Sequence, residues 1–341
     1  MSRDPSALPR DDRRIYDAYV AGRRSAALAV GVRLGLFDLL DAGPLDEEAL
    51  RTSLDVRARP LRSLLAALLG MRFLERREGR YSLADDVSDY LVRGKPGWLG
   101  GLVDLEVEHF LGPQALLEAM RADRATVYGD EDPWEAHERD PERAERFTAA
   151  MHSVSERPAA GLAEVVGFVP GERVLDVGGG SGALSLAIAR AHPEVRCVVF
   201  DLPVVCEAAR RYVDAAGLAD RVRAEPGDMF ASSLPFGYDT ILFSQILHDW
   251  PPATGGELLR KAAAALPPGG RVLVHEKLVE DETYGPEANA LVNLDMLLWT
   301  EGQQYRWSEL RDLIAGSGFA RDTVERRATA GYWTVAIART R

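Results

Sequence analysis

The segment with the clearest chemistry is a glycine-rich run that follows a short apolar stretch. It reads RVLDVGGGSGA over residues 173–183. A strand that ends in glycines and leads into a helix lets a nucleotide approach the backbone at the helix N-terminus. Gly178, Gly180 and Ala183 satisfy the dinucleotide fingerprint G-x-G-x-x-G/A, and Asp201 follows at a spacing that suits a ribose hydroxyl. On the glycines alone, a nicotinamide dinucleotide stays open as the ligand.

An acid two residues before the first glycine separates the candidate cofactors. A carboxylate at Asp176 is unfavourable beside the phosphates of a dinucleotide because like charges repel, but it suits the cationic amino group of S-adenosylmethionine. The sequence therefore favours S-adenosylmethionine, which has no pyrophosphate to bind. We expect Gly178, Gly180 and Gly182 to wrap its methionine end.

Further acids follow the next two expected strands. Asp201 is placed to bind the ribose hydroxyls, and Asp228 is placed to take the adenine amine with two apolar side chains against the ring. The predicted cofactor residues in this part of the chain are Asp201, Leu202, Asp228, Met229, Phe230 and Ser244.

A histidine follows the fourth expected strand, in the run LFSQILHDWP over residues 242–251. Side chains at the carboxyl ends of strands in an open α/β sheet point into the ligand crevice. Methyl transfer to a hydroxyl needs alignment and removal of a proton, and imidazole accepts protons near neutral pH. We therefore predict His248 as general base, with no metal required. Glu276, after the fifth strand, is expected to orient it, and Asp249 is the rival.

Strands alternating with helices must position these residues. Short β-branched runs at 174–177, 195–200, 240–243 and 271–275 are separated by helical stretches, which predicts a Rossmann-like, doubly wound parallel α/β sheet. Upstream, apolar residues at helical spacing predict buried helices within 15–40 and 61–74. Glu78–Leu83 predicts a hairpin with a glycine turn, and together these elements outline a winged helix.

We predict three segments: a mainly helical winged-helix dimerisation domain at 1–97, a helical linker and substrate-pocket wall at 98–166, and an S-adenosylmethionine-binding domain at 167–341. A winged helix can read DNA, but its third helix offers only Arg57, Arg59 and Arg62 as basic residues. The strongly apolar stretch 26–40 fits a dimerisation and lid module better.

The composition is that of a globular protein of 341 residues, 46% hydrophobic and 28% charged. Its net charge of −12 argues against binding to nucleic acid or an anionic membrane. Two cysteines, Cys197 and Cys206, lie in neither disulfide nor zinc spacing. No apolar signal core or membrane span is found. We expect a soluble cytoplasmic enzyme with no metal.

In this order, the motifs resemble the family of plant and bacterial small-molecule O-methyltransferases, which includes caffeate, hydroxyindole and polyketide-tailoring enzymes. The resemblance runs from the N-terminal region through the glycine loop to DLP (201–203), GDMF (227–230), LHDW (247–250) and AGSGF (315–319). It implies an interlocked homodimer whose N-terminal domains wall the partner's pocket. It also implies catalysis by the histidine of the HDW motif between two carboxylates, and His248 and Glu276 match the first two members of that set.

The second carboxylate of that set departs from the family pattern. Family members commonly carry Gly-Gly-Arg-Glu-Arg-Thr, whereas this chain reads EGQQYRW over residues 301–307. We interpret Tyr305 as standing in the acid's place, so that either Glu301 reaches the base or the base has one carboxylate. The departure leaves open methyl transfer to carbon, such as the α-carbon of a 2-oxo acid. Some family members that methylate carbon resemble metal-dependent enzymes with additional histidine ligands. The histidines available for a metal, none singled out by spacing, are His109, His137, His152 and His275.

Aromatic and methionine side chains at helical spacing predict the walls of a pocket for a flat organic acceptor. The candidates are Trp134, Phe147, Met151, His152, Asn293, Met296, Leu297 and Trp299, of which we assign Phe147, Met151, Asn293 and Met296 to the substrate. The leading hypothesis is methyl transfer to a hydroxyl of an aromatic or polyketide-like metabolite in secondary metabolism. The alternatives are a C- or N-methyltransferase, a nicotinamide dehydrogenase and a winged-helix DNA-binding regulator.

Overall fold

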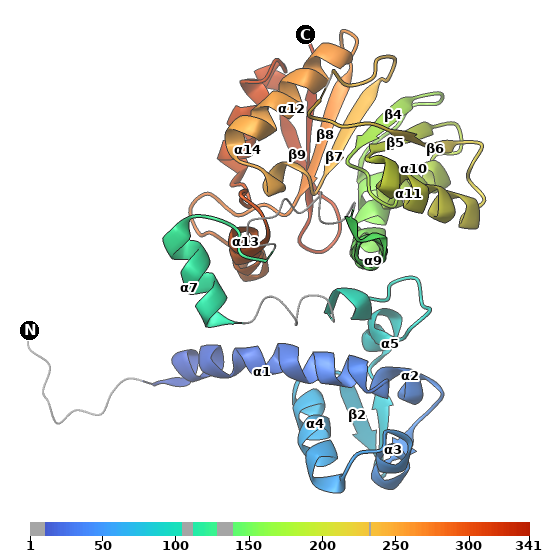
Figure 1. The fold of residues 1–341 in the computed structure, drawn as a ribbon, viewed down its shortest axis with the longest axis vertical. Coiled ribbons are helices and arrows are strands. Elements are labelled where there is room, and N and C mark those ends of the chain that lie inside the picture. Colours follow the sequence, from blue (N-terminus) through green and yellow to red (C-terminus); the bar gives the residue numbers. More distant parts are fainter. Residues whose placement is uncertain (1–10, 104–111, 128–138, 232) are drawn as a thin grey trace, which may run out of the picture. The chain divides into compact units, whose positions relative to one another are not determined.

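The computed structural model describes residues 11–103, 112–127, 139–231 and 233–341 (Figure 1). The chain divides into two compact units, one up to residue 111 and one from Gly112 onward. The finer division into three segments stays a prediction.

The first unit combines helices with a three-stranded antiparallel sheet in the order β1-β3-β2. Glu78 and Gly79 join β2 to β3 with φ angles of 50° and 80°, as a two-residue hairpin turn requires. The predicted hairpin is therefore present. The elements are α1 (Arg13–Arg33), α2 (Leu36–Asp41), β1 (Leu45–Asp46), α3 (Glu47–Ser53), α4 (Ala58–Gly70), β2 (Leu74–Arg77), β3 (Arg80–Leu83) and α5 (Asp85–Leu91).

The helical pattern predicted within 15–40 forms two helices, because Gly35 adopts a left-handed φ of 69° between α1 and α2. The expectation of buried helices holds for the end of α1 and for α2, but not for the start of α1. Its 21 residues extend past the small core of the unit, so Ile15 is 72% and Tyr19 63% exposed. The start of α1 therefore presents apolar and aromatic side chains on the surface of its unit.

The second unit is built on a seven-stranded sheet in the order β6-β5-β4-β7-β8-β10-β9. The first five strands in this order run parallel, as predicted, whereas β10 is antiparallel to both β8 and β9. Neither β9 nor the antiparallel β10 was predicted from the sequence. The strands are β4 (Arg173–Val177), β5 (Arg196–Asp201), β6 (Val222–Pro226), β7 (Thr240–Ser244), β8 (Arg271–Glu276), β9 (Glu325–Ala328) and β10 (Thr334–Arg339).

Helices cover both faces of this sheet, because its central strands are apolar on both sides. Leu175 and Val177 of β4 pack with residues of α12 and α14, and Val174 packs on the opposite face with α9, α10 and α11. The helices are α7 (Pro113–Ala122), α9 (Pro141–Val165), α10 (Ala183–Ala191), α11 (Pro203–Ala215), α12 (Pro252–Ala265), α13 (Glu287–Trp299) and α14 (Trp307–Ala315), with short 3₁₀ turns η1 (Leu247–Asp249) and η2 (Arg321–Thr323).

The strand order changes direction between β4 and β7. From β4 the chain proceeds to β5 and β6 on one side and then returns to β7 and β8 on the other side. At such a switch point, the loops after the two central strands diverge and leave the crevice in which open α/β sheets bind ligands. The glycine loop follows β4 and His248 follows β7, so both lie at this point.

Candidate active site

The glycine loop has a backbone that only glycine adopts without strain. Gly178, Gly180 and Gly182 have φ angles of 65°, 57° and 80°, and Gly182 is the N-cap of α10. A Cβ at Gly178 would lie 2.4 Å from the Ile246 side chain. The loop therefore turns tightly against the segment that carries His248. Its glycine N–H groups bond within the protein, to the Phe200 carbonyl, Asp201 Oδ2 and the Gly179 carbonyl.

The acid of the loop lies beneath these glycines. Asp176 is 1% exposed, and its Oδ2 accepts a hydrogen bond of 2.7 Å from Ser185 Oγ. Its Oδ1 is buried without a hydrogen-bond partner in the described part of the chain. Burial, together with the charge of Asp201, raises the pKa of Asp176 to about 7. A buried acceptor under a glycine cradle fits a cationic donor, as the ammonium group of S-adenosylmethionine would be.

The end of β5 is tied to the same loop. Asp201 Oδ2 accepts a hydrogen bond of 2.8 Å from Gly180 N, and its Oδ1 accepts one of 2.7 Å from Leu202 N. Burial raises the pKa of Asp201 to about 6. These two bonds fix the carboxylate next to the loop that would cradle the cofactor.

The loop after β6 reaches toward the histidine motif. Asp228 is exposed and accepts a 2.7 Å hydrogen bond from Phe230 N. Lys261 Nζ of α12 donates to the carbonyls of Met229 and Phe230, each at 2.8 Å. The Phe230 ring meets Trp250 edge-on, with centroids 4.7 Å apart. The predicted adenine-binding segment is thus fastened beside the HDW motif.

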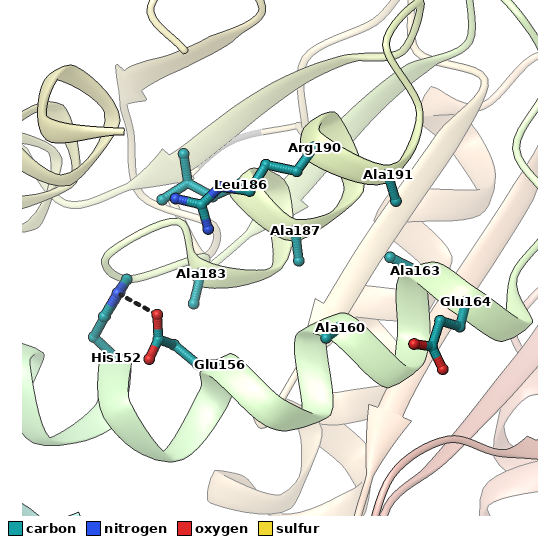
Figure 2. Close-up of a pocket in the computed structure, with 10 residues that line it drawn as sticks. All are labelled: His152, Glu156, Ala160, Ala163, Glu164, Ala183, Leu186, Ala187, Arg190 and Ala191. Carbon is teal, nitrogen blue, oxygen red and sulfur yellow. Dashed lines mark ion pairs between the residues drawn. The ribbon is translucent and has the colours of Figure 1, made fainter. Parts of the chain in front are cut away.

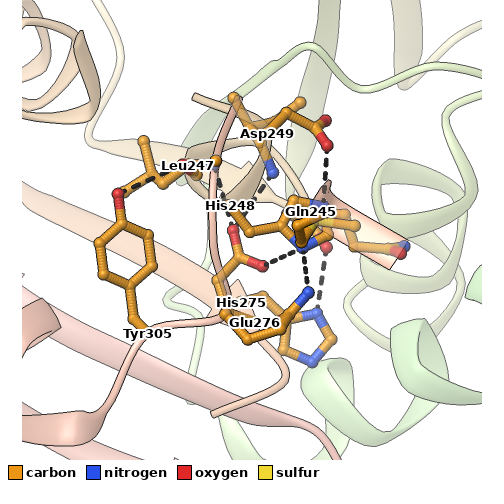
Figure 3. Close-up of polar contacts among 12 residues, drawn as sticks. Gln245, Leu247, His248, Asp249, His275, Glu276 and Tyr305 are labelled. Carbon is orange, nitrogen blue, oxygen red and sulfur yellow. Dashed lines mark hydrogen bonds and ion pairs between the residues drawn. The ribbon is translucent and has the colours of Figure 1, made fainter. Parts of the chain in front are cut away.

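His248 lies in η1, directly after β7, and is 9% exposed (Figure 3). Its Nδ1 is 3.4 Å from Glu276 Oε2, and its Nε2 is 3.5 Å from Asp249 Oδ1. The fully buried Glu276 accepts hydrogen bonds of 3.2 Å from Ile246 N and Leu247 N. Both carboxylates considered from the sequence therefore contact the imidazole, at different nitrogens.

Burial sets the protonation of this cluster. Burial and the charge of Lys277 lower the pKa of His248 to about 4, so its imidazole is neutral at neutral pH. Burial also raises the pKa of Asp249 to about 7, and burial with the charge of Asp249 raises that of Glu276 to about 8. A neutral imidazole can accept a proton, which is what a general base requires.

The residue that completes this cluster is Gln304, not Tyr305. Gln304 Nε2 lies 2.9 Å from His248 Nδ1. The Tyr305 hydroxyl instead donates to the Leu247 carbonyl at 3.3 Å (Figure 3). Successive side chains of an extended segment point to opposite sides. Aligning this segment with the family motif one residue too far along therefore selects Tyr305 in place of Gln304. Glu301 is exposed. The placement of Tyr305 beside the base was therefore wrong.

Contacts from α9 support the loops of the crevice. Ser155 Oγ accepts a 3.2 Å hydrogen bond from Gln245 Nε2, and His152 Nδ1 lies 2.7 Å from Ser181 Oγ in the glycine loop. Burial and the charge of Arg190 lower the pKa of His152 to about 4. No short motif marks these contacts, because they join residues far apart in the sequence. The predicted substrate residues of this helix, both half-buried, are Phe147 and Met151.

The remaining predicted residues lie around the ends of β7 and α13. Ser244 Oγ is 3.1 Å from Nδ1 of the buried His275, whose pKa burial lowers to about 3. Asn293 Oδ1 accepts a 2.7 Å hydrogen bond from Gln304 N, which links α13 to the histidine cluster. Met296, one turn further along α13, is 8% exposed.

A separate cleft of about 360 Å³ lies between α9 and α10 (Figure 2). His152 Nε2 and Glu156 Oε1 face each other there at 3.8 Å. Among the described residues, no group of three His, Cys, Asp or Glu side chains could hold a metal ion. Nor is any described helix long and apolar enough to cross a membrane. The candidates that lie outside the described residues are His109, His137 and Trp134.

Comparison with known proteins agrees with this geometry. The model of the O-methyltransferase domain matches residues 114–320, and the model of the O-methyltransferase dimerisation domain matches residues 18–94. The chain belongs to the O-methyltransferase family.

This O-methyltransferase is similar to enzymes that act on small metabolites. It is 35% identical over 310 residues to the 3-hydroxy-5-methyl-1-naphthoate 3-O-methyltransferase of Streptomyces sahachiroi, covering 90% of this chain and 89% of the relative. It is 30% identical to the L-tyrosine C(3)-methyltransferase of Streptomyces lavendulae, covering 90% and 86%. The structure of human N-acetylserotonin methyltransferase in complex with S-adenosylmethionine matches with a TM-score of 0.86 and 25% identity over 99% of both chains.

The O-methyltransferase is therefore an enzyme that uses S-adenosylmethionine to methylate small molecules. Its fold is that of its relatives, a helical dimerisation domain followed by a seven-stranded α/β domain.

Proposed function

We propose that this enzyme methylates a hydroxyl of a small aromatic or polyketide-like metabolite of secondary metabolism, with His248 as general base. The observation that carries the proposal is a buried, neutral imidazole at the end of β7, with Glu276 Oε2 3.4 Å from its Nδ1. This imidazole lies at the switch point between β4 and β7, beside the glycine loop, where we expect the methyl donor and the acceptor to meet.

Methyl transfer requires the protein to align the acceptor oxygen with the methyl group of the donor and to remove the proton of the acceptor hydroxyl. S-adenosylmethionine supplies a methyl group on a positively charged sulfur. With its ring proton on Nδ1, His248 accepts the proton of the acceptor hydroxyl at Nε2. The hydroxyl oxygen would take the methyl group as the methyl carbon–sulfur bond breaks, and the donor would leave as the neutral thioether S-adenosylhomocysteine. Glu276, held by two backbone N–H groups and 3.4 Å from Nδ1, orients the imidazole. The proton then leaves His248 to solvent, which restores the base.

We assign the donor site to the loops after β4, β5 and β6. Asp176 faces the ammonium group, the glycines cradle the methionine end, and Asp201 binds the ribose. The residues proposed for the donor are Asp176, Gly178, Gly180, Gly182, Asp201, Leu202, Asp228, Met229, Phe230 and Ser244. Those proposed for the acceptor are Phe147, Met151, Asn293 and Met296, with aromatic and thioether surfaces that suit a flat ring.

The enzyme is proposed to act as a homodimer in the cytoplasm. The dimerisation-domain match and the exposed apolar start of α1 support the dimer. Two free, buried cysteines support a reducing compartment.

The test is an acceptor screen with S-adenosylmethionine that carries a ¹³C methyl group. The panel contains 3-hydroxy-5-methyl-1-naphthoate, N-acetylserotonin and L-tyrosine, with His248→Asn as the matched control. We expect the label as a methoxy carbon on a hydroxylated aromatic, and at least about 100-fold less of it with the variant. Label attached to ring carbon or nitrogen would contradict transfer to oxygen.

A further inference from the structure

The group closest to Nδ1 of His248 is a neutral carboxamide. Gln304 Nε2 lies 2.9 Å from Nδ1, nearer than Glu276 Oε2 at 3.4 Å. Gln304 is 4% exposed, and Asn293 Oδ1 accepts its backbone N–H at 2.7 Å. The amide is therefore held against the imidazole by its own burial and by α13.

Two buried oxygens beside the imidazole, Gln304 Oε1 and Glu276 Oε2, have no hydrogen-bond partner in the described part of the chain. A half-turn of the carboxamide exchanges its nitrogen and oxygen, so Gln304 can offer Nδ1 either a donor or an acceptor. A carboxylate there would only accept, and its charge would stabilise the imidazolium. The carboxamide adds no such charge. Its hydrogen bond raises the pKa of His248, but burial and the charge of Lys277 outweigh that effect.

The charged groups that face His248 come from two elements. Asp249 lies on η1 itself, and Glu276 and Lys277 lie at and after the end of β8. Lys277 opposes a positive imidazolium, and burial raises the pKa of both acids. The negative charge available to a protonated His248 is therefore small, and Gln304 does not add to it.

We propose that Gln304 is a positioning residue that keeps His248 a weak base, because it places a neutral amide where a second carboxylate would stabilise the imidazolium. The inference rests on the proposed transfer to oxygen. A weak base removes protons only from hydroxyls that are already acidic. Phenols, with pKa values of about 10, then suit the site, whereas alkanols, about as weakly acidic as water at about 15.7, do not.

The test is an NMR titration of the whole enzyme with ¹⁵N-labelled histidine, in which His248→Asn identifies the signal. In the wild type, we expect His248 to stay neutral down to about pH 5. Gln304→Glu should raise its pKa by at least about one unit, because an opposite charge then lies beside Nδ1. Gln303→Glu, the same change at a half-buried neighbouring residue, is the matched control and should leave that pKa in place.

Two results would overturn the proposal: a wild-type His248 that titrates at or above its ordinary value of about 6.5, or an unchanged pKa in Gln304→Glu. Should Gln304→Glu fail to fold, Gln304→Met gives a neutral side chain of similar length. A rise of the His248 pKa by one unit or more in that variant would also contradict the proposal. None of these measurements needs methyl transfer, so failure of the proposed function appears separately, in the acceptor screen.

Discussion

Two carboxylates, the buried Asp176 and the half-buried Asp201, are expected to make cofactor binding depend on pH. Their pKa values are raised, to about 7 and about 6, so both acids take up protons as the pH falls through that range. The ammonium group that S-adenosylmethionine and S-adenosylhomocysteine share favours an ionised Asp176, and the ribose hydroxyls donate to an ionised Asp201. Protonation of either acid therefore weakens binding. We expect the affinity for S-adenosylhomocysteine, measured by calorimetry, to fall about tenfold between pH 7 and pH 5.5.

Asp176→Asn is the matched variant for this prediction. It keeps the shape of the side chain and cannot ionise, so the affinity at pH 7 should drop and most of the pH dependence should disappear. The same pH dependence in the variant would show that another group controls binding.

At the same scale, the sequence located some site residues and not others. His248 and Glu276 could be placed because each follows a recognisable apolar strand, and parallel strands end at one edge. Gln304 lies in an irregular segment, where a shift of one position reverses the side chain, and no periodicity fixes the count. The contact between His152 and Ser181 depends on how α9 packs, which no local pattern determines.

At the scale of elements, the glycine loop packs so closely against the Ile246 side chain that Gly178 has no room for a Cβ atom. Gly178→Ala adds a Cβ within 2.4 Å of that side chain and also strains a left-handed residue with a φ of 65°. We expect an affinity for S-adenosylhomocysteine at least about tenfold weaker, equivalent to about 1.4 kcal/mol. Calorimetry on the purified variant measures it.

Gly217 provides the matched control for this loop. It has the same φ of 65° after α11, and a Cβ there would meet nothing within 4 Å. Gly217→Ala should cost about 1–2 kcal/mol of stability, measured by denaturant unfolding, and leave the affinity within about twofold. Equal losses of affinity in both variants would mean that strain alone, and not the contact with Ile246, weakens binding.

Most of the sheet could be predicted from the sequence, since β4, β5, β7 and β8 are continuous apolar runs. The edge strand β9 could not, because all four of its residues are exposed and its sequence, ERRA, has no alternation. The break between α1 and α2 was also missed, because one glycine within a helical pattern does not by itself end a helix.

At the scale of the whole molecule, the exposed side chains at the start of α1 are expected to be covered by a second copy of the chain. Light scattering should give a mass about twice the 37.4 kDa of one chain. Replacing Ile15 by Asp and Tyr19 by Glu should reduce the mass to that of one chain, because buried charges oppose association.

Val169, 63% exposed in the second unit, offers the control Val169→Asp. It should leave the mass unchanged. A wild-type mass of one chain, or a double variant that still dimerises, would contradict the assignment of this surface.

The central claim is that His248 removes the proton while other residues hold the donor. The most direct measurement compares His248→Ala with the wild type, using the acceptor that the screen identifies. His192→Ala is the control, since His192 lies at the far end of α10 and bonds the Ala163 carbonyl. The account predicts a kcat at least about 100-fold lower for His248→Ala, an S-adenosylhomocysteine affinity within about threefold, and an unchanged control. Unchanged turnover in His248→Ala would contradict it.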